Sequence, residues 1–362
     1  MKAKKIKIKF LTIHRPDRSP SQRFRFEQYI DFLTQNGYDC KMSYLLNEKD
    51  DKIFYQKGKV FYKAFIIFKG LIKRLVELYF DEKYDIIFVQ RESIMLGTSF
   101  IERKYAKRGV KLVFDFDDSI WIQNVSDANK MFRWLKNPSK TSKIISYASL
   151  VFAGNEYLKN YALKYNENVI IVPTTIDTNE YTRVKQKNKD EIVIGWSGSI
   201  TTIQHFEYAL PFLREIKNKY QNKVKFRVIG DANYINRELN IKGKEWNKTS
   251  EIEDLSEFDI GIMPLPDDEW ANGRCGLKGL QYMALKIPTI MSPIGVNSQI
   301  ISDGVNGMLA SNVDEWVNKI SQLIESSDLR NSIGEKARIT VEEKYSVVSN
   351  RQICLKSFKD LV

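Results

Sequence analysis

The stretch DIGIMPLPDDEWANGRCGLKGLQYMALKIPTIMSPIGVNSQIISDGVNGML, residues 259–309, decides the fold. Its pattern predicts a buried strand over Ile260–Pro264, a polar loop, an apolar helix and a second strand over Pro288–Met291. In such a unit of a parallel sheet, the start of the helix presents free backbone N–H groups and the positive end of its dipole. The unit therefore predicts an anion site at the carboxyl edge of a sheet.

The loop of this unit carries two cations and two glycines that suit a phosphate. Arg274 and Lys278 lie in the turn, and Gly273 and Gly276 let a ligand approach the backbone closely. We expect the two cations to bind a phosphate or a diphosphate. A solvated loop with surface charges is the alternative, because many charged loop residues have no further role.

Several blocks of the sequence resemble glycosyltransferase family 4 (glycosyl transferases group 1), the retaining enzymes of the GT-B fold, and within it a branch that makes bacterial surface polysaccharides. Besides the stretch above, which resembles the donor-binding region, the blocks are FDFDDSIW (114–121), VFAGNEYLKNYA (151–162), VPTTID (172–177), IGWSGSITT (194–202) and EEKYS (342–346). The resemblance implies an α/β chain with two Rossmann-like domains, whose parallel sheets face each other across a cleft.

The alternation of strand and helix patterns predicts the same architecture from the residues alone. Strands are expected at Ile6–Ile13, Ile86–Gln90, Lys111–Phe116, Leu150–Ala153, Val169–Val172, Ile192–Trp196, Phe226–Ile229, Ile260–Pro264, Thr289–Met291 and Gly307–Leu309. We expect an N-terminal acceptor domain over 1–185 and a donor domain over 186–345, joined by the polar segment KQKNKD (185–190). The resemblance implies that residues from about 346 to 362 form a helix that crosses back to the first domain.

The donor site departs from the family in one respect. Most members carry two glutamates eight positions apart, and those positions here hold Gly273 and Gln281. The resemblance implies that the first contacts the donor sugar and the second the ribose, so the sugar preference does not carry over, whereas Gln281 can still bond a ribose hydroxyl. The expected donor-binding residues are Ser197, Gly198, Ser199, Gly230, Gly273, Gly276, Leu277 and Gln281.

The expected catalytic residues come from both halves. Arg274 and Lys278 are expected to stabilise the charge that builds on the leaving diphosphate, which is the main electrostatic term in such a transfer. His14 follows the first strand in an arginine-rich segment and is expected to position or deprotonate a substrate group. Arg23 and Arg25 of that segment either reach a phosphate or lie at a solvated helix start.

Three aspartates end the strand in FDFDDSIW. Asp115 and Asp117 match the DxD metal motif of GT-A glycosyltransferases, but the better phosphate site lies far downstream. We therefore expect Asp117 and Asp118 near the acceptor, orienting or deprotonating its hydroxyl, with a helix N-cap as the alternative. The two histidines exclude a histidine-based metal site, and we expect no metal and no cofactor besides the nucleotide-sugar substrate.

The net charge of +12 belongs to the first half of the chain, because residues 1–178 hold 32 Lys and Arg against 20 Asp and Glu. Within that half, residues 51–80 interleave basic and aromatic side chains, which favours docking on an anionic membrane surface. A core helix with buried lysine stems is the alternative. The basic N-terminus MKAKKIKIKFLTI reads as a strand and not as a signal peptide, and three widely spaced cysteines fit a reducing compartment.

Together these features predict a retaining glycosyltransferase on the cytoplasmic face of the plasma membrane. It would move a sugar from a UDP- or GDP-sugar to a glycan or lipid-linked acceptor in bacterial surface-polysaccharide synthesis. The alternatives are a 2-epimerase-like GT-B enzyme, a nucleotide-sugar-binding pseudoenzyme, and a basic nucleic-acid-binding protein. The last is disfavoured because the phosphate motif lies in the neutral half, so we expect no nucleic-acid partner.

Overall fold

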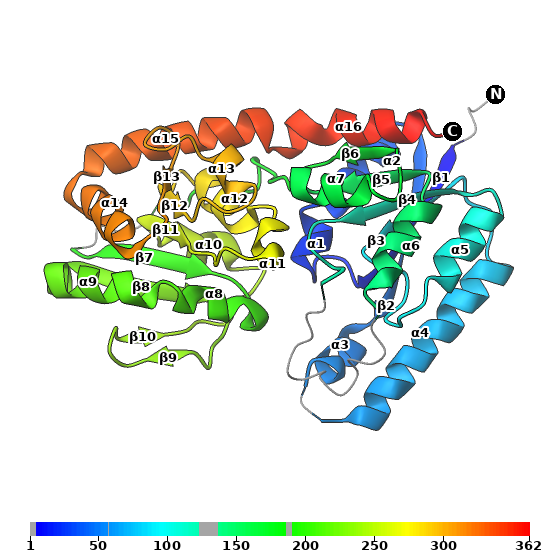
Figure 1. Cartoon of the computed structure of the whole chain (residues 1–362), viewed down its shortest axis with the longest axis horizontal. Helices are drawn as coiled ribbons and strands as arrows, with labels where there is room; N and C mark the ends of the chain where they lie inside the picture. The colour runs from blue at the N-terminus through cyan, green and yellow to red at the C-terminus, as the bar shows by residue number, and fades with distance from the viewer. Residues whose placement is uncertain (1–4, 57, 123–136, 186–189) are drawn as a thin grey trace. The chain divides into compact units, whose positions relative to one another are not determined.

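The computed structural model describes residues 5–56, 58–122, 137–185 and 190–362. The chain divides into two compact units: unit 1 comprises Met1–Pro173 and Arg351–Val362, and unit 2 comprises Thr174–Asn350. Each unit holds one large parallel sheet accompanied by helices (Figure 1). The predicted fold class, α/β with two Rossmann-like domains, is confirmed.

Unit 1 is built on six parallel strands in the order β2-β1-β3-β4-β5-β6. The strands are β1 (Ile6–His14), β2 (Tyr38–Leu46), β3 (Ile86–Gln90), β4 (Lys111–Phe116), β5 (Leu150–Ala153) and β6 (Val169–Ile171). The order reverses between β1 and β3, which makes their carboxyl ends the place where an open parallel sheet binds ligands. Strand β2 is missing from the sequence prediction because it lies at the edge of the sheet and mixes charged with half-buried positions.

The helices of unit 1 connect these strands. They are α1 (Pro20–Arg23), α2 (Ile30–Gln35), α3 (Glu48–Phe54), α4 (Val60–Phe80), α5 (Phe100–Lys107), α6 (Ser139–Tyr147) and α7 (Glu156–Ala162). A continuous helix over 24–35, which the pattern suggests, is interrupted before the 3-10 turn Glu27–Tyr29. The interruption lets Phe26 turn inward, where its ring stacks on that of Phe10 at 5.0 Å.

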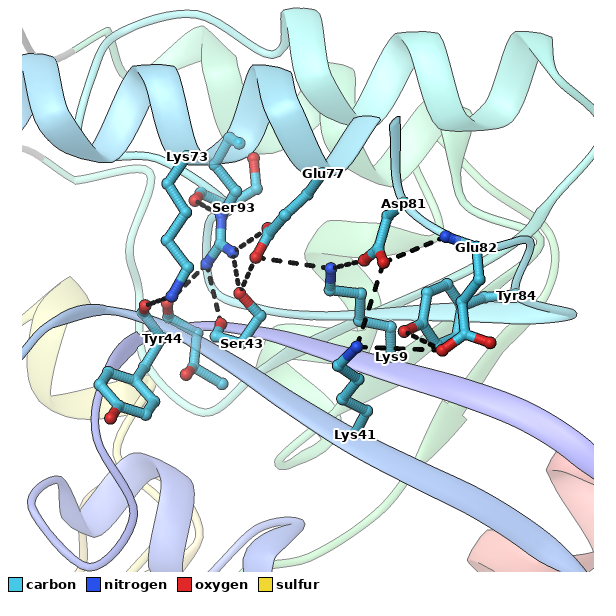
Figure 2. A network of polar contacts seen from close by, with 12 residues as sticks. Lys9, Lys41, Ser43, Tyr44, Lys73, Glu77, Asp81, Glu82, Tyr84 and Ser93 are labelled. Carbon is cyan, nitrogen blue, oxygen red and sulfur yellow. Dashed lines mark hydrogen bonds and ion pairs between the residues drawn. The ribbon is translucent and has the colours of Figure 1, made fainter. Parts of the chain in front are cut away.

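Helix α4 is held against the sheet by one buried guanidinium. Arg74 has no exposed surface, and its five N–H groups donate to Thr12 O, Ser43 O and Oγ, Glu77 Oε2 and Ser93 O at 2.6–2.9 Å. Figure 2 shows Ser43, Glu77 and Ser93 converging on this point from three different elements. Because an arginine has five such donors, all of them are used, and α4 is fixed to β1, to β2 and to the loop after β3.

Unit 2 repeats the plan with five parallel strands in the order β13-β12-β11-β7-β8. The strands are β7 (Ile192–Ser197), β8 (Val224–Ile229), β11 (Ile260–Met263), β12 (Thr289–Met291) and β13 (Met308–Leu309), and a small antiparallel hairpin is formed by β9 (Ile235–Asn236) and β10 (Ile241–Lys242). The order reverses between β7 and β11, so the loops after these two strands are neighbours at the carboxyl edge.

The helices of unit 2 include the one predicted from the decisive stretch of sequence. They are α8 (Ile203–Glu207), α9 (Leu210–Tyr220), α10 (Glu251–Ser256), α11 (Glu269–Asn272), α12 (Leu277–Ala284), α13 (Asn297–Ile300), α14 (Val313–Glu325) and α15 (Ser327–Lys344). The core of this unit packs α9 and α14 against the sheet, with the rings of Phe212 and Trp316 stacked at 4.6 Å.

The chain passes between the units at Pro173 and Asn350, whereas the sequence places the first boundary at 185. Residues after Pro173 belong to unit 2 because they pair there: Ile176 bridges to Ser346, and Tyr181 bonds to Glu251. Helix α16 (Val347–Lys359) carries the chain back, and Phe358 packs on Tyr38 and Phe88 of unit 1. Most of the expected linker at 185–190 lies outside the described residues.

Among the described helices, none combines the length and the apolar character that crossing a membrane requires.

The buried guanidinium gives a test of how unit 1 is held together. Arg74→Met should lower the free energy of unfolding by about 3–5 kcal/mol, since it removes the closer of the two cations that pair with Glu77 and the side-chain donor to three backbone carbonyls. Thermal melting followed by circular dichroism would measure the loss. The matched control is Arg103→Met, an exposed arginine on neighbouring α5, for which we expect about 0.5 kcal/mol or less. Equal melting temperatures for the two variants would refute the anchoring role.

Candidate functional site

The carboxyl edge of the unit 2 sheet brings together the two loops that the sequence singles out. Strands β7 and β11 pair directly, with Ile194 opposite Ile260 and Gly195 opposite Gly261. The turn 197–199 follows β7, and the loop that leads to α12 follows β11. Both loops therefore start at the point where the strand order reverses, which is the ligand-binding place of such sheets.

Glycines allow the backbones of the β7 and β8 loops to touch. Gly198 N donates to Ile229 O at 2.9 Å, and Gly230 has a φ of +133°, a conformation that side chains rarely adopt. A Cβ on Gly230 would lie 2.5 Å from Gly198 O, and one on Gly198 would lie 2.2 Å from the indole of Trp196. Neither site has room for a side chain, so the structure requires glycine at both expected donor positions.

The start of α12 has the geometry of an anion site. Its N-cap, Gly276, has a φ of +70°, and Leu277 is the first helical residue. A Cβ on Gly276 would lie 2.4 Å from Ile300 Cδ1, so the backbone here passes close to its neighbours. The first-turn N–H groups of the helix have no partner within the helix itself, and this end carries the positive pole of the dipole.

The two expected cations lie at this helix start and rest on aromatic rings. The Lys278 ammonium is 4.8 Å from the ring centre of Trp196, and the Arg274 guanidinium is 5.6 Å from that of Trp270. Trp196 belongs to β7, so Lys278 reaches from α12 to the neighbouring strand. A cation–π contact helps to fix the position of a cation. The two contacts therefore hold Arg274 and Lys278 at the start of α12.

A hydroxyl of α12 ties the two loops to each other. Tyr282, which is fully buried, accepts a hydrogen bond from Ser197 N at 2.7 Å, and its oxygen is 2.9 Å from Ser197 Oγ. Burial raises the pKa of Tyr282 above its usual value, so the phenol stays protonated. Ser199, at the end of the turn, forms a capping box with Thr202. Ser197 thus has a structural partner, while Ser199 lies exposed at the rim.

The two positions where the family usually has glutamates differ in their surroundings: Gln281 is buried in a hydrogen-bond network, and Gly273 lies at the end of α11. Gln281 is buried on α12, and its Nε2 donates to Tyr181 Oη at 2.9 Å and to Glu251 Oε1 at 3.0 Å. Glu251 also accepts from Tyr181 and from Trp246, so Gln281 belongs to a buried network. Gly273 is the C-cap of α11 with an ordinary φ of −78°. Conformation alone therefore does not demand glycine at 273.

His205 is a residue of unit 2 that lies near the two cations. It is buried on α8, and burial together with the charges of Lys278 and Arg274 lowers its pKa to about 4. The imidazole is therefore neutral at pH 7. The sequence contained a signal for this position, because a short helix that follows the turn after β7 starts at the same edge of the sheet as the two cations.

In unit 1 the strand ends carry ion pairs. His14 ends β1, and its Nδ1 lies 3.5 Å from Asp51 Oδ1, while Tyr55 Oη lies 3.3 Å from its Nε2. Asp51 also pairs with Arg15 at 3.3 Å and with Arg18. Burial opposes the charge on Asp51, but hydrogen bonds from His14 and Arg18 outweigh it and hold the pKa well below its usual value. His14 is thus oriented by an ionised carboxylate.

The aspartates after β4 are engaged by an arginine that the sequence reading missed. Arg91, just after β3, lies 2.9 Å through Nε from Asp117 Oδ1 and 3.2 Å through Nη2 from Asp118 Oδ2. Its φ of +61° is unusual for a non-glycine residue, and its N–H bonds to Asp115 O. The sequence offered a signal, namely a cation at the end of a buried strand next to β4.

Asp115 does not face the same way as its neighbours. It is buried and paired with Arg25, which also donates to Val172 O. Arg25 is therefore an internal residue of unit 1, which corrects the reading of it as a phosphate ligand or a solvated helix start. Among the described residues, no group of three or more His, Cys, Asp or Glu side chains is arranged to hold a metal ion. Asp115 and Asp117 pair with two different arginines, Arg25 and Arg91.

The comparisons with known proteins bear on this geometry. Residues 191–326 match the model of the family described as Glycosyl transferases group 1. The match contains β7, the turn 197–199, α8, Gly230 and the whole of α12. It confirms the resemblance to this group and the class of enzyme, a glycosyltransferase. Curated proteins give no match.

Solved structures with the same fold include three from bacteria. A glycosyltransferase from Rickettsia africae is 14% identical with a TM-score of 0.67, covering 99% of both chains. HepE of Anabaena, solved with UDP-glucose, is 14% identical with a TM-score of 0.66, covering 98% of this chain and 100% of that one. Sucrose-phosphate synthase from Thermosynechococcus elongatus is 11% identical with a TM-score of 0.68, covering 99% of both. At these identities the likeness shows the fold, which is GT-B.

The low pKa of His205 predicts how stability depends on pH. The pKa of about 4 in the folded protein lies below the ordinary value of 6.5 for histidine, so the unfolded chain takes up the proton first as pH falls. The contribution of neutral His205 to the free energy of unfolding is complete above pH 6.5. As pH falls toward 4, the free energy of unfolding decreases by about 1–3 kcal/mol. Urea unfolding at pH 5 and 7.5 would show this slope in the wild type and a smaller slope in His205→Gln. Equal slopes would contradict it.

His205 also reports whether an anion enters the site. A bound diphosphate would offset the charges of Arg274 and Lys278, so the pKa of His205 should rise when UDP binds. The chain has two histidines, and His205→Gln would assign the imidazole signals in a proton NMR titration. His14 is the internal control, because it belongs to unit 1. A His205 signal that titrates identically with and without saturating UDP would place the anion elsewhere.

Proposed function

We propose that this protein is a retaining glycosyltransferase that uses a nucleotide-diphosphate sugar. Unit 2 binds the donor, UDP- or GDP-linked, and unit 1 binds a glycan or lipid-linked acceptor of bacterial surface-polysaccharide synthesis. The reaction runs without a metal ion, on the cytoplasmic face of the plasma membrane. UDP is the first donor nucleotide to test, since HepE, which has the same fold, is solved with UDP and with UDP-glucose.

One observation carries the proposal: Arg274 and Lys278 meet the N-terminal end of α12 at the switch point of the unit 2 sheet. A diphosphate placed there would receive two cations, the free N–H groups of the helix and its dipole. In sugar transfer, negative charge grows on the leaving diphosphate, so this fixed positive charge stabilises the transition state more than the ground state. The same groups take the place of a metal ion.

The acceptor side follows from the ion pairs of unit 1. Arg91 pairs with Asp117 and Asp118 and so fixes the positions of both carboxylates. We assign these aspartates to orienting the acceptor. His14, held by Asp51 at the end of β1, is the group that would accept or position the hydroxyl proton.

The proposed donor site departs from the family at Gly273 and Gln281, and the two changes have different consequences for donor binding. At Gly273 there is no carboxylate to contact the sugar, so recognition of the sugar falls to other residues of the neighbouring turns of unit 2. At Gln281 the amide nitrogen bonds to Tyr181 and Glu251. We infer that a ribose hydroxyl, if it reaches this depth, meets the Gln281–Glu251 pair rather than one glutamate.

Lys278→Ala tests the donor site. With UDP at 100 times its Kd, the wild type should gain about 2.7 kcal/mol of stability, seen as a rise in melting temperature in the presence of EDTA. Lys278→Ala should lose most of this rise and at least about 100-fold in kcat, while its own unfolding free energy falls by about 1 kcal/mol through the lost contact with Trp196.

The matched control is Lys225→Ala, an exposed lysine on β8 that should keep both the shift and the turnover. A shift that appears only with added Mg²⁺ or Mn²⁺ would contradict metal-independent binding. A shift without hydrolysis or transfer of any UDP- or GDP-sugar would contradict the enzyme and leave a nucleotide-sugar-binding pseudoenzyme.

A further inference from the structure

Helix α4 has an unusual distribution of polarity. The face toward unit 1 is mixed: it buries the apolar Ile66 and Leu78, and it also carries charged side chains, with Arg74 and Lys63 completely buried and Glu77 largely so. The face toward solvent is apolar over the whole length of the helix. Its exposed large side chains, which we call the α4 apolar face, are Phe61, Tyr62, Phe65, Phe68, Ile72, Val76, Tyr79 and Phe80.

The exposure on this face is large and regular. Phe61 is 90% exposed, Phe65 is 64% exposed and Phe80 is 83% exposed, where a globular protein normally buries such side chains. The positions 61, 65, 68, 72, 76 and 79 recur every three or four residues, so they form one stripe along the helix. A contiguous apolar stripe of this kind on a surface marks an interaction site.

The polar contacts of the inner face keep the apolar face outward. Besides the five bonds of Arg74, Lys73 Nζ donates to Tyr44 O at 2.5 Å, and Lys9 pairs with Glu77 at 3.4 Å and with Asp81. Figure 2 shows these contacts along one side of the helix. Rotating α4 to bury its aromatic residues would break all of them, at a cost of several hydrogen bonds to charged groups.

The surroundings of the α4 apolar face are basic. Helix α4 has one acidic residue, Glu77, and α5 has one, Glu102, which is buried against Ser93. Arg108 lies over the ring of Tyr79 at 4.8 Å and donates to Leu78 O, so the end of α5 adjoins the stripe. The exposed cations of this rim are Lys59, Arg103, Lys107 and Arg108, whereas the exposed Lys69 pairs with Asp50.

We propose that the α4 apolar face docks on a lipid bilayer that contains anionic lipid. The aromatic and aliphatic side chains would enter the interface, and the basic rim would meet the negative headgroups. The positive charge around the α4 apolar face argues against a second copy of the chain as the partner that covers this face. A twofold contact through this face would bring two equal basic rims together, and like charges repel.

The hollow beside the stripe indicates what kind of lipid recognition to expect. It has a volume of about 340 Å³ and is lined by Val76 and Phe80 together with Lys9, Lys41 and Lys73. Its cations have partners already: Lys9 pairs with Glu77 and Asp81, and Lys41 lies 4.0 Å from Asp81. Docking should therefore follow the charge density of the surface and not the identity of the headgroup.

Vesicle sedimentation of the full chain tests this inference, which does not rest on donor binding because it concerns unit 1 alone. The wild type should sediment with vesicles of phosphatidylcholine and phosphatidylglycerol, and far less with phosphatidylcholine alone. Cardiolipin at the same charge density should act like phosphatidylglycerol. A triple variant, Phe61→Ser with Phe65→Ser and Phe68→Ser, should bind at least about 30-fold more weakly.

Two further variants separate the apolar and basic contributions. Ile235→Ser with Ile339→Ser, which changes exposed apolar residues of unit 2, should bind as the wild type does. Arg103→Gln with Lys107→Gln should weaken binding to anionic vesicles by about fivefold per charge and leave melting unchanged. UDP-induced stabilisation, measured on all variants, should be the same, so failure at the membrane and failure at the donor site remain distinguishable.

Other outcomes would overturn the proposal. Equal binding to neutral and anionic vesicles would remove the role of the basic rim. Absence of vesicle binding, together with a wild-type dimer that the triple variant dissociates in sedimentation velocity, would make the face a protein interface. A monomeric wild type that binds no vesicle would leave the stripe without the proposed occupant.

Discussion

The candidate donor site of unit 2 depends on the hydrogen bonds between Ser197 and Tyr282. Two loops can hold one diphosphate only if their backbones keep a fixed distance, and these bonds, together with the contact of Lys278 with Trp196, join the loops after β7 and β11. The buried phenol of Tyr282 bonds to both the N–H and the hydroxyl of Ser197, so α12 is fastened to the end of β7. The glycines at 195 and 261 leave room for the rings that make this contact, because a Cβ at either would strike Phe258 or Tyr282 at 2.2–2.5 Å.

Unit 1 uses a buried polar anchor in a different way. In most amphipathic helices, apolar side chains face the core and charges face water. In α4 the anchor of Arg74 stands beside buried apolar contacts such as that of Ile66, and the large aromatic side chains lie on the outer face. A buried ion pair contributes little net stability compared with an apolar core, but breaking it is costly, so it fixes orientation well. A fixed orientation suits a helix whose exposed face is apolar, because it prevents the helix from rotating that face toward the interior of unit 1.

The sequence predicts most strands of both sheets because buried parallel strands are continuous apolar runs, as in Ile86–Gln90 and Ile260–Met263. It fails at β2, an edge strand whose charged positions hide the period. Within the site it predicts Arg274, Lys278 and the glycines, since local spacing determines them. It cannot predict that Arg91 would hold the aspartates or that His205 would lie beside the cations, because these meet through the order of strands in the sheet rather than through spacing along the chain.

Charge has two separate uses in this chain. The net positive charge belongs to the first half, yet the cations at the strand ends of unit 1 are matched by carboxylates: Arg25 by Asp115, Arg91 by Asp117 and Asp118. In unit 2, Lys278 and Arg274 lie over indole rings at the start of α12, and these contacts help to fix where the two cations stand. A small anion is recognised by such local, preorganised charge, whereas an extended surface responds to the summed charge of a face. The neutral half is therefore the better place for a diphosphate, and the basic half for a surface.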